Sequence, residues 1–166
     1  MLKKELSQFY EEIYHLQNFE LALGEYFQQL AMFFPNEKWF WEEAVADEIS
    51  HARHVGKLIV MVSSGPLKFG LGRYRVALLE TYLGGIYENI EKLERKDLSP
   101  KEALKIAFDY ENSILETKPF DIVSSNSTAF REFKDKLYPD LEAHCERIRQ
   151  YTQQKMASLT GVSPAK

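Results

Sequence analysis

The chain has 166 residues, of which 45% are hydrophobic and 28% are charged, as in an ordinary globular protein that folds as one domain. Its net charge of -4 provides no basic surface for nucleic acid or for an anionic membrane, and no apolar run is long enough to span a bilayer. We therefore expect a single domain over residues 1–166 that binds neither of these partners.

The N-terminal stretch MLKKELSQFYEEIYH has the pattern of an amphipathic helix and not of a signal peptide, which predicts a cytoplasmic protein. The single cysteine, Cys145, excludes a disulfide within the chain and any metal site built from four cysteines. We expect it to be a small, partly buried side chain.

Apolar residues recur with a helical period along the whole chain, and no segment alternates as a strand does. Proline, asparagine, serine and glycine interrupt this pattern, which predicts an all-α protein with five helices. The predicted helices span residues 2–34, 37–62, 73–96, 100–118 and 128–156.

The first two predicted helices meet at a tight corner at Pro35 and should form an antiparallel hairpin. The last two should form a second hairpin, and the helix over 73–96 then joins the two hairpins. This order of elements predicts a helical bundle with one long crossover connection.

Glu48 lies at the centre of the apolar face of the second helix, where a charged side chain is unusual. A helix turns about 100° per residue, so each side chain can be given a direction. The residues within roughly 40° of Glu48 include Trp41, Ala44, Ala52, Val55, Ile59 and Val62. His51 shares this face, whereas Asp47 and His54 fall near its boundary, where we expect solvated side chains or indirect support of a ligand.

Glu20 likewise lies at the centre of the apolar face of the first helix, whereas Glu25 points outward. The apolar neighbours of Glu20 on its face are Phe9, Ile13, Leu16, Phe27, Ala31 and Phe34. With a rise of 1.5 Å per residue, Glu20, Glu48 and His51 lie roughly 22, 18 and 22 Å from the Pro35 corner. All three should therefore share one level of the hairpin.

The two remaining bundle helices each carry one such residue, Glu111 and His144. Asp140 precedes His144 by one helical turn and shares its face. Glu80 in the crossover helix lies roughly 95° from the apolar stripe and is expected at the surface.

Acidic and imidazole side chains from four helices thus point to one apolar interior. Burying an ionised carboxylate without a partner is costly, so the set needs a compensating positive charge, and a metal ion would serve. Without a metal, Glu111 would pair with a lysine such as Lys118, and the other residues would form a buried hydrogen-bonded cluster.

These residues resemble the ferritin-like superfamily, and its rubrerythrin-like branch in particular. The resemblance covers FELALGEYFQQLAMFFPNEKWFWEEAVADEISHARHV, SPKEALKIAFDYENSILE and FREFKDKLYPDLEAHCERI. The family pattern is one Glu from each of two helices and Glu-x-x-His from each of the other two, which together bind two irons. It implies a ferritin-like four-helix bundle with an extra crossover helix. The metal ligands that it implies are Glu20, Glu48, His51, Glu111 and His144.

The second Glu-x-x-His motif is degenerate, because Leu141 stands where its glutamate would be. In the family that glutamate usually bridges the two metals, so the expected positions do not supply a complete set of six ligands. Asp140 is the candidate replacement, although it is shorter and follows Pro139, which can kink or start a helix.

The resemblance implies a cofactor of one or two non-haem irons, or manganese, and an oxidoreductase acting on dioxygen or peroxide. Electrons would come from a separate donor, since the chain lacks the cysteines of a rubredoxin-type domain. The alternative is a metal-poor bundle that forms a homodimer or binds another protein through its crossover helix, where Gly84 and Gly85 permit close approach. Whether the protein is an enzyme stays open, and the sequence identifies no substrate.

Overall fold

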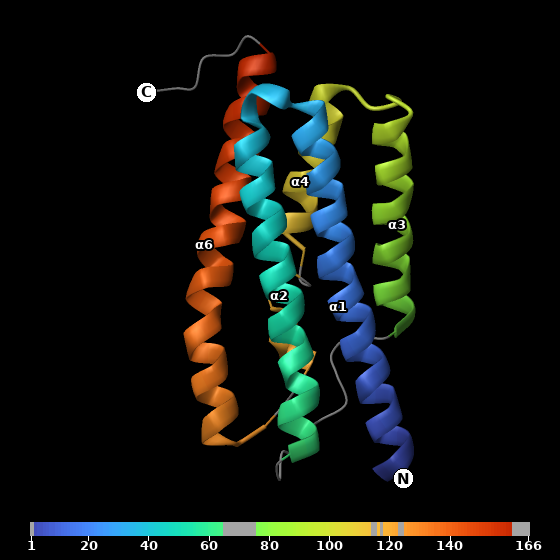
Figure 1. Ribbon diagram of the computed structural model, residues 1–166, viewed down its shortest axis with the longest axis vertical. Coiled ribbons are helices and arrows are strands. Elements are labelled where there is room, and N and C mark those ends of the chain that lie inside the picture. The colour runs from blue at the N-terminus through green and yellow to red at the C-terminus, as the bar shows by residue number, and fades with distance from the viewer. Residues whose placement is uncertain (1, 65–75, 114–115, 117, 123–124, 161–166) are drawn as a thin grey trace.

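The computed structural model describes residues 2–64, 76–113, 116, 118–122 and 125–160. Over these residues it contains five α-helices and no strand, which confirms the predicted all-α class. The elements are α1 (Leu2–Phe33), η1 (Pro35–Glu37), α2 (Lys38–Ser64), α3 (Val76–Glu94), α4 (Pro100–Glu111), η2 (Pro119–Ile122) and α6 (Thr128–Leu159), where η marks a short 3-10 helix (Figure 1). None of the described helices is both long and apolar enough to cross a membrane.

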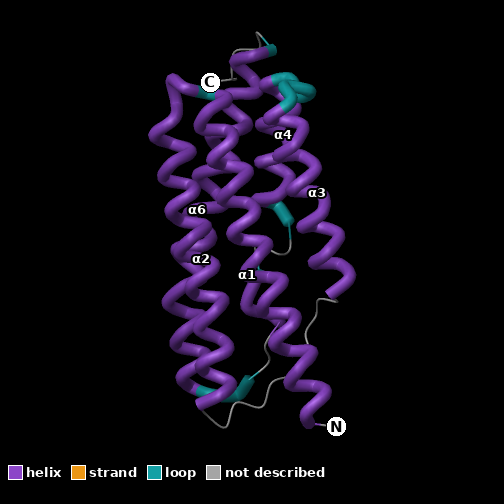
Figure 2. The backbone as a smooth tube through the Cα atoms, turned by 45° about the vertical axis from the view of Figure 1, so that its right-hand side comes forward, coloured by secondary structure: helices purple, strands orange, loops and turns teal. Residues whose placement is uncertain are grey.

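The helices run along the long axis of the molecule, and α3 connects the pair α1 and α2 to the pair α4 and α6 (Figure 1). α1 and α2 form an antiparallel pair. α3 packs along the outer side of α1 and runs in the same direction as α1, which returns the chain to the end where α2 begins (Figures 1 and 2). α4 then runs parallel to α2 and packs against α6, which runs back in the opposite direction.

The corner between α1 and α2 is a single 3-10 turn that begins at Pro35, whose ring lacks the N–H needed to continue α1. Phe27 of α1 and Phe34 at its end both contact Trp41 of α2, with ring centroids 5.6 and 6.5 Å from that of Trp41. These buried rings fix the register of the pair, and therefore the level at which Glu20 faces α2.

α4 is shorter than the predicted helix over 100–118, because it ends at Glu111. The Asn112 side chain donates a hydrogen bond to the carbonyl of Phe108 (2.7 Å). Side chains that bond the backbone in this way compete with helix continuation and favour helix ends. The predicted helix end at residue 118 is therefore wrong, and this matters for the residues that follow Glu111.

α6 runs from Thr128 to Leu159 without a break, three residues beyond the predicted helix over 128–156, and it includes Pro139. The directions of side chains on both sides of Pro139 can therefore be compared with that of His144 on one continuous helix. The buried residues of α6 are Phe130, Leu137, Leu141, His144, Cys145, Ile148 and Thr152.

Candidate metal centre

Six buried polar side chains gather at one level of the interior. All six are at most 7% exposed, in a core that is otherwise mainly apolar. They are Glu20 of α1, Glu48 and His51 of α2, Glu111 of α4, Glu116 from the segment after α4, and His144 of α6. Four carboxylates and two imidazoles are thus brought together by the packing of four helices.

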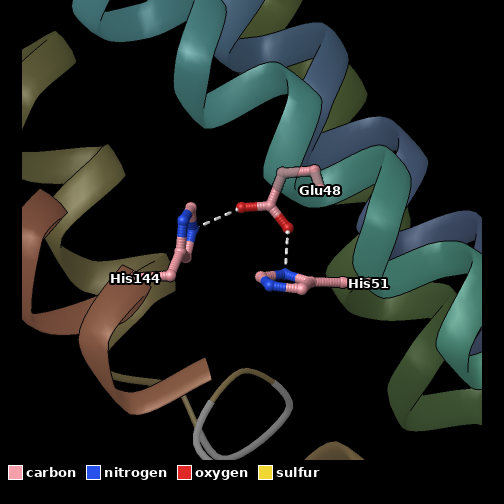
Figure 3. A group of neighbouring side chains, drawn as sticks. All are labelled: Glu48, His51 and His144. Carbon is pink, nitrogen blue, oxygen red and sulfur yellow. Dashed lines mark hydrogen bonds and ion pairs between the residues drawn. The ribbon is translucent and has the colours of Figure 1, made fainter. Parts of the chain in front are cut away.

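Glu48 is the hub of this group, since its two carboxylate oxygens contact different imidazoles. Its Oε1 atom accepts a hydrogen bond from Nε2 of His144 (2.8 Å), and its Oε2 atom lies 3.1 Å from Nδ1 of His51 (Figure 3). The two imidazole rings meet edge to face, with centroids 4.9 Å apart. A single carboxylate therefore links the metal-ligand candidates of α2 to that of α6.

His144 is held from its other side by Asp47. Its Nδ1 atom lies 3.0 Å from Oδ2 of Asp47, which also accepts a hydrogen bond from Arg147 (2.5 Å). Arg147 in turn donates to Glu43 (2.8 Å). Asp47, predicted near the boundary of the apolar face, thus orients the imidazole of His144, as carboxylates behind metal-ligating histidines commonly do.

The charges of Glu48 and His144 stabilise each other. Burial alone would raise the pKa of Glu48, but the imidazoles of His144 and His51 outweigh it and hold that pKa at about 2. Burial likewise opposes the charged form of His144, yet the carboxylates of Glu48, Asp47 and Glu111 raise its pKa well above 6.5. Without a metal, His144 is therefore an imidazolium with both ring nitrogens donating.

Among the described residues, Glu20 and Glu116 have no cationic partner at hydrogen-bond distance. Oε2 of Glu20 lies 3.7 Å from Nδ1 of His51, and the oxygens of both groups otherwise face carboxyl groups of the same cluster. Burial, followed by the charges of Glu116 and Glu48, raises the pKa of Glu20 well above 4.5. Burial, followed by the charges of Glu48 and Glu111, does the same to the pKa of Glu116. Burial and the neighbouring carboxylates thus favour the protonated form of both groups in the metal-free chain, and a cation would compete with those protons.

The structure brings together five of the six predicted ligand candidates. Oε2 of Glu20 lies 3.7 Å from Nδ1 of His51, so that Glu20, Glu48 and His51 share one level as expected. Oε1 of Glu111 lies 3.4 Å from Nε2 of His144, so the two candidates from α4 and α6 also meet.

Asp140 is the candidate that the structure leaves outside. Its side chain is exposed, and it belongs to none of the groups of close donor atoms among the described residues. It shares a helical face with His144, but it lies one turn away, at the wall of a pocket and not in the core. The expectation that Asp140 replaces the missing glutamate is therefore not met.

Glu116 is the residue that sequence reasoning missed. In a continuous helix it would point roughly 140° away from Glu111 and face solvent. Because α4 ends at Glu111, the chain is free to turn Glu116 inward, within 4.8 Å of donor atoms of Glu20, Glu48 and His51. The signal was available in Asn112 and Ser113, two residues that favour helix ends.

A pocket of about 370 Å³ opens between α2 and α6 and reaches both imidazoles. Leu141 lines it beside His51 and His144, with further apolar walls from Phe120 and Leu137. The position where the family pattern has a glutamate is thus an apolar wall next to the donor atoms. Small molecules have a route from solvent to this side of the centre.

Comparisons of the chain with protein-family models, with curated protein sequences and with solved structures found no match. Four buried carboxylates next to two imidazoles fit divalent iron or manganese, which oxygen and nitrogen ligands suit.

Proposed function

We propose that the chain is a ferritin-like metalloprotein that binds two divalent ions, iron or manganese. α1, α2, α4 and α6 form its four-helix bundle, and α3 is the crossover. The observation that carries the proposal is the set of four buried carboxylates and two imidazoles. The family pattern has the same number of carboxylate and imidazole ligands. Glu116 would supply the carboxylate that is missing because Leu141 occupies the position of the family's glutamate.

The donor atoms of the described residues form three overlapping groups. Glu20 and His51 would hold one ion, and Glu111 and His144 would hold the other. Glu48 contacts both imidazoles, and Glu116 lies within 4.8 Å of donor atoms of Glu20 and His51 and, in a separate group, of Glu111. Both carboxylates would therefore be available to either ion.

The balance of charge accommodates two ions. Four carboxylates with the imidazolium of His144 would leave negative charge in a buried site, which is costly unless protons on Glu20 and Glu116 or cations neutralise it. Two divalent cations and two neutral imidazoles would neutralise four carboxylates. Metal binding should therefore release protons and stabilise the fold.

The pocket supports a reaction with a small oxidant. Two ferrous ions, if held by these residues, would supply electrons to dioxygen or peroxide, and the pocket would give such molecules access next to His51 and His144. The apolar side chains of Leu137 and Leu141 limit water on that side, while Asp47 keeps the imidazole of His144 oriented. A separate protein or small molecule would restore the electrons.

Metal analysis tests the proposal. The purified protein, loaded with ferrous iron without oxygen and then desalted, should retain about two ions per chain. Glu48→Gln should lower this number, because it removes the carboxylate that contacts both histidines. Glu80→Gln, at an exposed position of α3, is the matched control and should leave it unchanged. A wild-type chain that retains no metal would defeat the proposal.

The oxidase or peroxidase activity needs its own measurement. The iron-loaded protein should consume dioxygen or peroxide faster than the same concentration of free ferrous iron. Equal rates would leave a metal-binding protein without this catalytic function.

A metal-poor interaction module is the second candidate, and the outer face of α3 favours it. Leu78 and Tyr87 are 40% and 46% exposed on opposite flanks of the helix, and between them no neighbouring side chain of the described residues lies within 4 Å of where a Cβ on Gly84 would be. A chain that sediments as a dimer, takes up no metal and is not stabilised by ferrous iron would support this function instead.

A further inference from the structure

Cys145 lies beside the proposed metal centre and not in a purely apolar part of the core. It is 2% exposed and follows His144 on α6. Neighbouring residues on a helix differ by about 100° in direction, so the two side chains face different partners. His144 faces Glu48, whereas the Sγ atom of Cys145 and oxygens of Glu111 and Glu116 all lie within 4.8 Å of one another.

Both carboxylates of this group need a further partner. Glu111 and Glu116 are fully buried. Oε1 of Glu111 pairs with Nε2 of His144 (3.4 Å), an imidazole that it shares with Glu48 and Asp47, whereas the oxygens of Glu116 face other carboxyl groups and the thiol. Two buried carboxylates that share one cationic partner, together with a thiol, form an arrangement that a further cation would stabilise.

The distances are close to those of ligands that share one ion. Three oxygen and sulfur ligands at about 2.1 and 2.3 Å from one metal ion are roughly 3.4–3.8 Å apart. Donor atoms within 4.8 Å of one another therefore need to close by up to about 1.4 Å. Small side-chain rotations supply such a shift.

We propose that the Sγ atom of Cys145 is a ligand of the ion held by Glu111 and Glu116. This inference rests on the proposed metal-binding function and adds a sulfur ligand to one of its two positions. On binding, the thiol proton leaves to solvent and a metal–sulfur bond forms, with no change in oxidation state. The position should therefore take thiophilic divalent ions such as Co²⁺, Zn²⁺ or Fe²⁺ in preference to Mn²⁺ or Mg²⁺.

A second pocket supports access to this position. It has a volume of about 660 Å³, and Glu116, Leu141, Cys145 and Arg149 are among the residues that line it. Leu141 also lines the pocket at the two imidazoles, so the two pockets adjoin at this residue. Reagents of small size can therefore be used to probe the thiol in the folded protein.

Cobalt spectroscopy tests the sulfur ligand. Co²⁺ added to the metal-free protein should give visible d–d bands and, in addition, a near-ultraviolet sulfur-to-cobalt charge-transfer band. Cys145→Ser, which keeps a side chain of similar size, should lose the charge-transfer band and keep visible bands. Glu80→Gln should give the wild-type spectrum.

Two results would overturn the inference in different ways. Visible bands without a charge-transfer band in the wild-type protein would mean that cobalt binds without Cys145, so that the proposed function stands and the sulfur ligand does not. No cobalt bands at all would defeat the metal centre together with the inference.

Thiol protection gives a second measurement that needs no variant at Cys145. Co²⁺ or Zn²⁺ should slow alkylation of the cysteine in the folded wild-type protein, and Mg²⁺ should not. Glu111→Gln should weaken this protection. Alkylation at the same rate with and without Zn²⁺, in protein that retains zinc, would contradict the inference.

Discussion

Glu48 and His144 lie 2.8 Å apart, although 96 residues separate them in the chain. Their contact joins α2 to α6, the two helices whose side chains also form the pocket at the centre. Since Glu48 contacts His51 as well, three of the six donors depend on the position of one carboxylate. The centre should therefore respond to changes at Glu48 both in stability and in metal binding.

Glu48→Ala should lower the free energy of unfolding of the metal-free protein by about 3–5 kcal/mol, since it leaves the buried His144 imidazolium without its main partner. Urea denaturation at neutral pH measures this change. Glu43→Ala is the matched control, because Glu43 is on the same helix and also pairs with α6, through Arg147, but is 53% exposed. It should cost at most about 1 kcal/mol. Equal effects of the two variants would mean that the buried pair has no special role.

Glu20→Gln should stabilise the metal-free protein at neutral pH and leave its stability at pH 4 unchanged. The pKa of Glu20 is raised in the folded state, first by burial and then by Glu116 and Glu48. Above pH 4.5 the native chain therefore binds more protons than the unfolded chain, and stability falls as pH rises, by up to about 1.4 kcal/mol per pH unit for this group. Removing the group removes this loss.

The measurement is the difference in free energy of unfolding between wild type and Glu20→Gln at several pH values from 4 to 7, without metal. The difference should grow with pH in favour of the variant. Added ferrous iron should reverse the order, because the carboxylate is then a ligand. A difference that does not vary with pH would contradict the assignment of Glu20 as a protonated buried carboxyl group.

Asp47→Asn should weaken metal binding without abolishing it. Asp47 contacts His144 but belongs to none of the described donor groups, so it orients a ligand and is not one. Loss of such a partner commonly costs roughly 10- to 100-fold in metal affinity. Competition with a chelator measures the affinity, and Glu43→Gln, which touches Arg147 but not His144, is the control. An unchanged affinity would show that the hydrogen bond to His144 is dispensable.

The three donors of the first hairpin could be placed from the sequence because α1 and α2 are long and uninterrupted. Helical phase then carries from residue to residue, and the Pro35 corner sets the level at which Glu20 meets Glu48 and His51. His144 was found for the same reason, since Pro139 does not break α6.

The positions of Glu116 and Asp140 could not be predicted from helical phase. Phase is lost where a helix stops, so the inward position of Glu116 could not follow from the pattern once α4 ended at Glu111. A shared helical face does not ensure burial either, because burial depends on what packs opposite. Asp140 lies on the face of His144 yet remains exposed at the wall of a pocket. Both depend on tertiary packing that a single sequence does not contain.

Leu141→Glu should rescue a chain that lacks Glu116. Glu116→Gln removes a carboxylate shared by the two sides of the centre, and the number of bound ions should fall from about two toward one. Leu141 is 4% exposed, precedes His144 by almost one helical turn, and lines the pocket with both imidazoles. A glutamate there would supply the missing oxygen ligand from the position that the family pattern uses.

Metal content of the double variant after anaerobic iron loading measures the rescue. Leu137→Glu in the Glu116→Gln background is the control, because Leu137 lines the same pocket one turn farther from His144 and should restore no metal. Without metal, the rescued variant should be less stable than Glu116→Gln alone, since it buries a new ionisable group. If the double variant binds no more iron than Glu116→Gln, the two positions are not equivalent, and Glu116 does not replace the glutamate that Leu141 displaced.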